Sequence, residues 1–98
     1  MIAIQFEWDE PKNNSNQNKH GVSFEEAASS FSDPWARIIQ DPDHSLEEDR
    51  FIHLGMSMKP RLLIVCHCYR GDGDEIIRII SARSATKMEA ANYRKHRR

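Results

Sequence analysis

The most apolar run of the sequence is LLIVCHCY, residues 62–69. Its length and its branched aliphatic side chains predict a buried β-strand. The turn sequence GDGD, residues 71–74, follows it and leads into a second apolar run over 75–82. A short turn between two such runs indicates antiparallel neighbours. We therefore expect 62–69 to be the central strand of a small sheet.

Further strands are expected on the N-terminal side of this run. Residues 51–57 predict one strand, which Lys59-Pro60 ends. Residues 35–40 predict a short strand, and residues 2–8 alternate apolar and polar side chains as a half-buried strand does. The acidic stretch 41–49 predicts a loop between two of them.

Three segments carry helix-start signals. Asp9 precedes a polar helix over residues 10–20, which Gly21 is expected to end. Ser23 and Glu26 have the spacing of a capping box, as do Thr86 and Glu89, which open a helix that runs through Tyr93. The element order predicts an α+β fold: a small, mainly antiparallel sheet with two N-terminal helices on one face and a C-terminal helix. The second face is expected either to stay partly open or to carry that last helix.

Length and composition limit the class of protein. With 98 residues we expect one domain over 1–98, ending in a basic tail at about 94–98. No apolar run approaches the ~18 residues of a membrane span, and the start has no pattern of a secretory signal. We expect a cytoplasmic protein with no membrane partner. Cys66 and Cys68 are expected to be buried thiols, and no histidine or cysteine has metal-ligand spacing, so we predict no metal and no cofactor.

The charge is divided between the two halves of the chain. Residues 1–50 hold four basic and eleven acidic residues, a net charge of −7, whereas residues 51–98 hold ten basic and four acidic residues, a net charge of +6. The total of −1 therefore conceals a basic half that can attract polyanions.

Two motifs resemble one protein family. The first is KHGV, residues 19–22, followed by FEEA at 24–27; the second is RIISAR, residues 78–83, followed by Ala85-Thr86. With FEWD at 6–9 and EDRF at 48–51, they resemble the BrnT family of toxins from bacterial toxin–antitoxin pairs, over about residues 6–93. The resemblance implies a RelE-like fold and a ribonuclease that blocks translation. It also implies neutralisation by a BrnA-type antitoxin encoded alongside, with DNA contacted only through that antitoxin.

RNA can be cleaved without a metal ion when the 2′-hydroxyl attacks the adjacent phosphorus. The reaction needs a base, positive charge on the phosphate oxygens, and an acid for the leaving oxygen. Arg78 and Arg83 are the first candidates to stabilise the phosphate. Arg70, at the end of the strand that holds His67, is a further catalytic candidate, and His67 and Glu48 are candidates for proton transfer.

Arg78 is also predicted to bind RNA, together with Lys19, His20 and Tyr93. In a flat strand residues 78 and 83 would point to opposite faces, and Arg83 is preferred for phosphate because a helix begins beside it. Arg78 could instead pair with an acid such as Glu7. His67 could be a buried, hydrogen-bonded histidine, and Tyr93 could pack its helix onto the sheet.

Two other functions stay open at the level of sequence. The chain could be a catalytically silent partner in an antitoxin repressor complex. It could also bind nucleic acid without cleaving it, with an affinity that falls steeply with salt.

Overall fold

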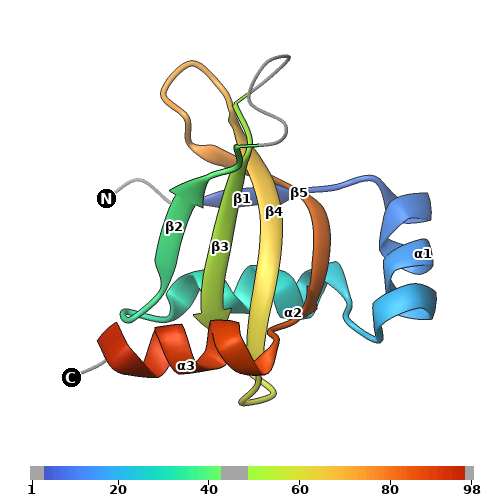
Figure 1. Cartoon of the computed structure of the whole chain (residues 1–98). Coiled ribbons are helices and arrows are strands. Elements are labelled where there is room, and N and C mark those ends of the chain that lie inside the picture. Colours follow the sequence, from blue (N-terminus) through green and yellow to red (C-terminus); the bar gives the residue numbers. More distant parts are fainter. Residues whose placement is uncertain (1–3, 43–48, 97–98) are drawn as a thin grey trace.

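One β-sheet separates two layers of helices in the computed structural model, which describes residues 4–42 and 49–96 (Figure 1). The first half of the chain forms β1 (Gln5–Glu7), α1 (Glu10–His20), α2 (Phe24–Ser29), the 3-10 turn η1 (Ser30–Ser32) and β2 (Arg37–Gln40). The second half forms β3 (Phe51–Met56), β4 (Leu62–Arg70), β5 (Ile76–Ser84) and α3 (Lys87–His96). These elements follow the predicted order.

The sheet is mixed, with strand order β1-β5-β4-β3-β2. The run LLIVCHCY lies in β4, so its prediction as the central strand is confirmed. The pairs β2·β3, β3·β4 and β4·β5 are antiparallel, as predicted, but β1 pairs with β5 in parallel. This parallel edge brings the start of the chain beside a strand that lies some 70 residues later, which no local turn signal could indicate.

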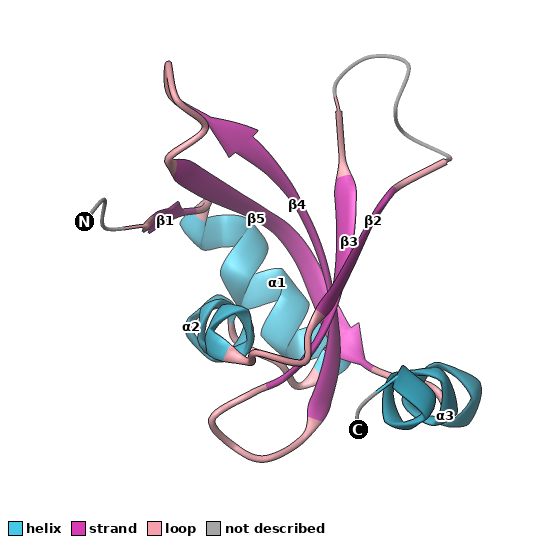
Figure 2. Cartoon of the chain, turned by 90° about the vertical axis from the view of Figure 1, so that its left-hand side faces the viewer, coloured by secondary structure: helices cyan, strands magenta, loops and turns pink. Residues whose placement is uncertain are grey.

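The two faces of the sheet differ in cover. Figure 2 shows α1 and α2 on one side of the sheet and α3 on the other. The core lies on the α1–α2 side and is built from these apolar side chains: Val22, Phe24, Ala27, Leu63, Val65, Ile77, Ile79 and Ala82. The alternate strand residues point to the opposite side, which we call the open face. Helix α3 crosses the open face only at the end away from the β4–β5 hairpin (Figure 1).

The helix caps form as the sequence predicts. The Asp9 carboxylate accepts from the Lys12 N–H at 3.1 Å, and Gly21 ends α1 at a φ of +70°, which favours glycine. At α3 the box is reciprocal: Thr86 Oγ1 accepts from Glu89 N–H at 3.1 Å, and Glu89 Oε1 accepts from Thr86 N–H at 2.8 Å.

The box predicted at α2 closes on one side only. Ser23 Oγ accepts from the Glu26 N–H at 3.1 Å, but the Glu26 carboxylate is fully buried and turned away from the cap. It accepts from Arg61 and from the Ser57 hydroxyl at 2.7 Å. A buried carboxylate needs such partners, and they hold the turn after β3 against α2.

The two buried residues of helix α1 are asparagines that bind backbone groups, and one of them takes the place of a strand beside β5. Beyond Glu7, β5 has no β1 residue beside it. There the Asn16 amide accepts from the Ala82 N–H at 3.1 Å and donates to the Ala82 carbonyl at 2.8 Å. Asn13 accepts from the Phe24 N–H at 2.9 Å. These amides satisfy buried backbone groups, so tertiary contacts stabilise a helix of poor intrinsic propensity.

A β-bulge decides where the arginines of β5 point. Cys66 pairs with Ser81 and His67 pairs with Ile79, so Ile80 is one extra residue. The extra residue reverses the alternation, because Ile79 and Ala82 both lie in the core. Arg78 pairs with Cys68 and Arg83 with Ile64, which lie on one side of β4, so both arginines lie on the open face. In a flat strand residues 78 and 83 would point to opposite faces, and the bulge is what places both on the same face. None of the helices in the described ranges is long and apolar enough to span a membrane.

Candidate functional site

Arg78 and Glu7 form a half-exposed ion pair on the open face. They are register partners on β5 and β1, and Arg78 Nη1 lies 2.6 Å from Glu7 Oε2. Their side chains are 34% and 41% exposed. The bond uses one guanidinium nitrogen, so the remaining Arg78 donors point to other partners or to solvent. The ion pair between Arg78 and Glu7, given above as an alternative to RNA binding, is thus observed. Arg78 still has further N–H donors with which to bind an anion.

Arg70 lies on the neighbouring strand, close to Arg78. It pairs with Ile76, two residues before Arg78, and Arg78 pairs with Cys68, two residues before Arg70. Such diagonal neighbours on one face have Cα atoms roughly 7–8 Å apart, a span that long side chains bridge. Glu7, Arg70 and Arg78 therefore form one cluster, which we call the arginine cluster. Two fork-shaped donors and one carboxylate at this spacing suit a phosphodiester.

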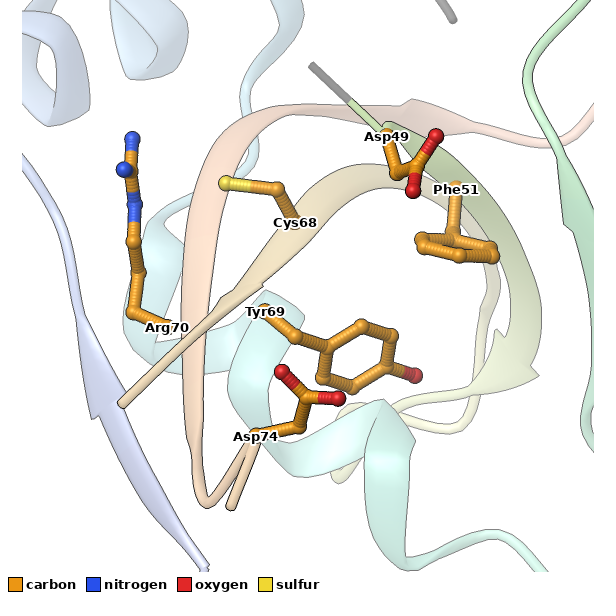
Figure 3. A pocket seen from close by; sticks show the side chains of 6 residues that line it. All are labelled: Asp49, Phe51, Cys68, Tyr69, Arg70 and Asp74. Carbon is orange, nitrogen blue, oxygen red and sulfur yellow. The ribbon is translucent and has the colours of Figure 1, made fainter. Parts of the chain in front are cut away.

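A pocket of about 290 Å³ opens beside this cluster, where β3 and β4 part beyond the Phe51–His67 pair (Figure 2). Its lining residues, shown in Figure 3, are Asp49, Phe51, Cys68, Tyr69, Arg70 and Asp74. Arg70 and Cys68 leave β4 on one side and the Tyr69 ring on the other (Figure 3). The volume is near the lower end of the roughly 300–1,000 Å³ typical of ligand pockets.

His67 is fully buried on the α1–α2 side, opposite Arg70. Burial lowers its pKa to about 4, so the ring is neutral at neutral pH. Its Nδ1 lies 3.3 Å from the Val65 carbonyl, which can only accept, so Nε2 is the acceptor for the Tyr69 hydroxyl at 3.3 Å. His67 therefore reaches the pocket only through Tyr69. Burial and the Asp74 charge raise the pKa of Tyr69, which keeps its hydroxyl protonated.

Arg83 is held in a closed ion pair at the start of α3. Its two terminal nitrogens donate to the two Glu89 oxygens at 2.8 and 2.9 Å. Glu89 also accepts from the Thr86 N–H, and the Arg83 hydrogen bonds lower the Glu89 pKa to about 2. The anion position expected at this helix start is thus occupied by the protein's own carboxylate. Arg83 serves the cap, and its fork is engaged there.

The other predicted residues lie away from the arginine cluster. Lys19 and His20 are exposed in the last turn of α1, on the far side of the sheet. Tyr93 is buried, and its hydroxyl donates to Asp33 at 2.6 Å, so its ring offers no face for base stacking in this structure. The structure therefore agrees with the alternative in which Tyr93 packs its helix onto the sheet. Glu48 lies outside the described residues.

Sequence reasoning missed the part of the pocket that comes from polar loop ends. Asp49 and Asp74 were not singled out, because loop carboxylates are usually only solvated. Glu7 was considered only as an ion-pair partner. The one available signal for Glu7 was its polar position in an alternating strand, and its place beside Arg78 depends on the parallel pairing. Within 4–42 and 49–96, no three His, Cys, Asp or Glu side chains are grouped to hold a metal ion.

Comparison with known proteins gives a family match over most of the chain. Residues 8–89 match the model of a family described as the ribonuclease toxin, BrnT, of type II toxin–antitoxin systems. A crystal structure of the Brucella abortus ribonuclease toxin BrnT superposes with a TM-score of 0.66 at 26% sequence identity. The alignment covers 87% of this chain and 100% of that one. No curated protein sequence matches the chain.

Proposed function

Because this chain belongs to the BrnT family of ribonuclease toxins of type II toxin–antitoxin systems, we propose that it is an endoribonuclease that cleaves RNA without a metal ion. In this proposal the enzyme is of the RelE-like kind and acts in the cytoplasm as one domain, and a BrnA-type antitoxin encoded alongside neutralises it. DNA is contacted only through that antitoxin.

The observation that carries the proposal is the arginine cluster itself. Arg70 and Arg78 are diagonal neighbours on one face, and the Glu7 carboxylate lies 2.6 Å from Arg78. A scissile phosphate between the two guanidinium groups would meet positive charge where charge develops in the transition state, and one such donor contributes roughly 10²- to 10³-fold in rate. Arg78 is thus favoured over Arg83, whose fork is occupied by Glu89.

The proposed reaction assigns a task to each group of the site. The 2′-oxygen forms a bond to phosphorus and the bond from phosphorus to the 5′-oxygen breaks, leaving a cyclic phosphate and a free 5′-hydroxyl. Glu7 takes the proton from the 2′-hydroxyl, and the 5′-oxygen takes its proton from solvent, because Tyr69 leaves β4 on the side away from the arginines and donates its own proton to His67. His67 fixes the position of the Tyr69 hydroxyl from behind. Lys19 and His20 remain proposed contacts for more distant RNA.

End-group analysis of RNA incubated with the purified protein, with a metal chelator present, tests the proposal. We expect 2′,3′-cyclic phosphate ends and free 5′-hydroxyl ends, and roughly 10²- to 10³-fold slower formation of these ends with Arg78→Ala. Cleavage that needs magnesium and leaves 5′-phosphates would overturn the mechanism. RNA that stays intact at high protein concentration would favour the silent partner of a repressor complex instead.

A further inference from the structure

A second pocket, distinct from the one beside Tyr69, lies between α3 and the open face. It measures about 350 Å³ and we call it the α3 groove. Its apolar lining comes from four sheet residues and one helix residue: Ile39, Ile52, Leu54, Ile64 and Met88. Arg37, Glu89 and Asn92 supply its polar edge. The groove is therefore an apolar trough with a charged rim.

Two of the groove's apolar side chains are strongly exposed. Ile39 on β2 is 55% exposed and Met88 on α3 is 83% exposed. Strand β2 is also the edge of the sheet. Isolated exposed apolar residues are common, but here both line the same groove, which is typical of an interaction site.

The rim carries an excess of positive charge. Arg37 Nη1 donates to the Asn92 side-chain oxygen at 2.8 Å and lies 2.6 Å from His96 Nδ1. Neither partner is a carboxylate, so these contacts do not cancel the charge of Arg37. The acidic member of the rim, Glu89, is neutralised by Arg83. Electrostatic complementarity therefore favours an occupant that carries carboxylates around its apolar side chains.

The α3 groove is continuous with the arginine cluster. Ile52 pairs with Cys66, and Ile64 is two residues before Cys66 on the same side of β4. Cys68, two residues further, pairs with Arg78. Along β4 the open face thus runs from the groove to the cluster in steps of two residues, roughly 7 Å each. A chain seated in the groove needs only a few more residues to cover Arg78.

We infer that the α3 groove is the docking site of the antitoxin, through a segment whose apolar side chains are flanked by Asp or Glu. The inference rests on the proposed function for its consequence, that the docked segment blocks RNA at the arginine cluster. That a partner exists follows from the family, because toxins of type II systems are paired with an antitoxin.

The chain offers matched control positions. Ile38 precedes Ile39 on β2, is 47% exposed, and points to the opposite side of the sheet. Met58, 64% exposed, lies in the turn after β3, where the groove does not reach. Ile39→Glu and Met88→Glu add a carboxylate to the groove, whereas Ile38→Glu and Met58→Glu add the same charge elsewhere.

Binding of each variant to the purified antitoxin from the adjacent gene is measured by calorimetry without RNA, and RNA cleavage is measured separately. We expect Kd to rise at least 100-fold for Ile39→Glu and at least tenfold for Met88→Glu, with the controls within threefold of wild type. Cleavage by all four variants should stay within threefold, and thermal melting checks that they fold.

Three results would overturn the inference. Equal weakening by groove and control variants would remove the specificity for the groove. Weaker RNA binding by Ile39→Glu would make RNA the occupant, and an isolated dimer that only the groove variants dissociate would make it a second copy of the chain. Since the binding assay contains no RNA, a wild-type protein that binds antitoxin but cuts no RNA would refute the nuclease proposal and leave the docking site intact.

Discussion

Two arginines of β5 lie on the same face, each paired with a glutamate from another element, and the two pairs differ in how many guanidinium nitrogens the glutamate binds. Arg78 gives Glu7 one nitrogen at 2.6 Å, and both side chains are half exposed. Arg83 gives Glu89 two nitrogens, and Glu89 in turn closes the cap of α3. We call the first pair the open pair, because Arg78 keeps N–H donors that a substrate can bind. We call the second the closed pair, because the N–H donors of Arg83 bind Glu89 and stabilise the start of α3. An arginine motif alone does not distinguish these situations.

The largest effect should separate Arg78→Ala from Arg83→Ala. Loss of Arg78 removes a donor from the proposed phosphate site, so kcat/KM for RNA should fall roughly 10²- to 10³-fold with little change in stability. Loss of Arg83 should change cleavage less than tenfold and lower the free energy of unfolding by about 0.5–1 kcal/mol. Single-turnover cleavage and urea unfolding measure both. The reverse ranking of activities would show that the closed pair is the site.

His67 provides a second test, because this titratable side chain contacts Tyr69, which lines the pocket beside the arginine cluster. Its pKa is about 4 in the folded protein against 6.5 for a free histidine. The unfolded chain binds more protons between these values, so stability is complete above pH 6.5 and falls as pH drops to 4, by roughly 2–3 kcal/mol. His67→Gln should flatten this part of the pH–stability curve. An equally steep curve in the variant would mean that another group titrates.

Glu7→Gln tests whether the open pair also supplies the base. The change keeps the shape and removes the carboxylate, so cleavage should fall about 10²-fold and the acidic limb of the pH–rate profile should disappear. Glu89→Gln is the matched change in the closed pair and should leave the profile's shape unaltered. If Glu7→Gln keeps both rate and profile, the base lies elsewhere, and Glu48 becomes the next residue to replace.

The smallest effect concerns the acid stability of the closed pair. Arg83 holds the pKa of Glu89 at about 2, below its ordinary value of 4.5. A carboxyl group whose pKa is lower in the folded than in the unfolded protein stabilises the fold above pH 4.5. This contribution is lost as the pH falls towards 2. We expect about 1 kcal/mol in this range after allowing for solvent screening, absent in Glu89→Gln. Denaturant unfolding at pH 5, 3.5 and 2.5 measures it; identical curves for the two proteins would show that the pair is not closed in solution.

The sequence predicted the elements well because their signals are local. Asp9, Ser23 and Thr86 begin helices by bonds within three residues, and LLIVCHCY is apolar enough to be central wherever its neighbours lie. The sequence left the direction of Arg83 open, because the one extra residue at Ile80 decides it, and a bulge in a run of apolar residues has no sequence signature.

Long-range contacts were beyond local reasoning for the same reason. Asn16 reaches backbone groups 66 residues away, and Glu26 meets Arg61 across 35 residues. The site depends on such contacts as well, since β1 joins β5 in parallel and thereby brings Glu7 to Arg78. His67 was recognised as the titratable group of the central strand, but alternation alone could not show that its side is covered by α2 and η1 rather than open to RNA.

The most direct test of the arginine cluster observes the guanidinium groups themselves. The Nε–Hε signals of the wild-type protein are followed by NMR while a 2′-O-methyl RNA, which binds but cannot be cleaved, is added. We expect the Arg70 and Arg78 signals to shift with the same apparent affinity, while the Arg83 signal keeps its position. A shift of the Arg83 signal with the Arg70 and Arg78 signals unchanged would contradict the assignment of RNA to the arginine cluster.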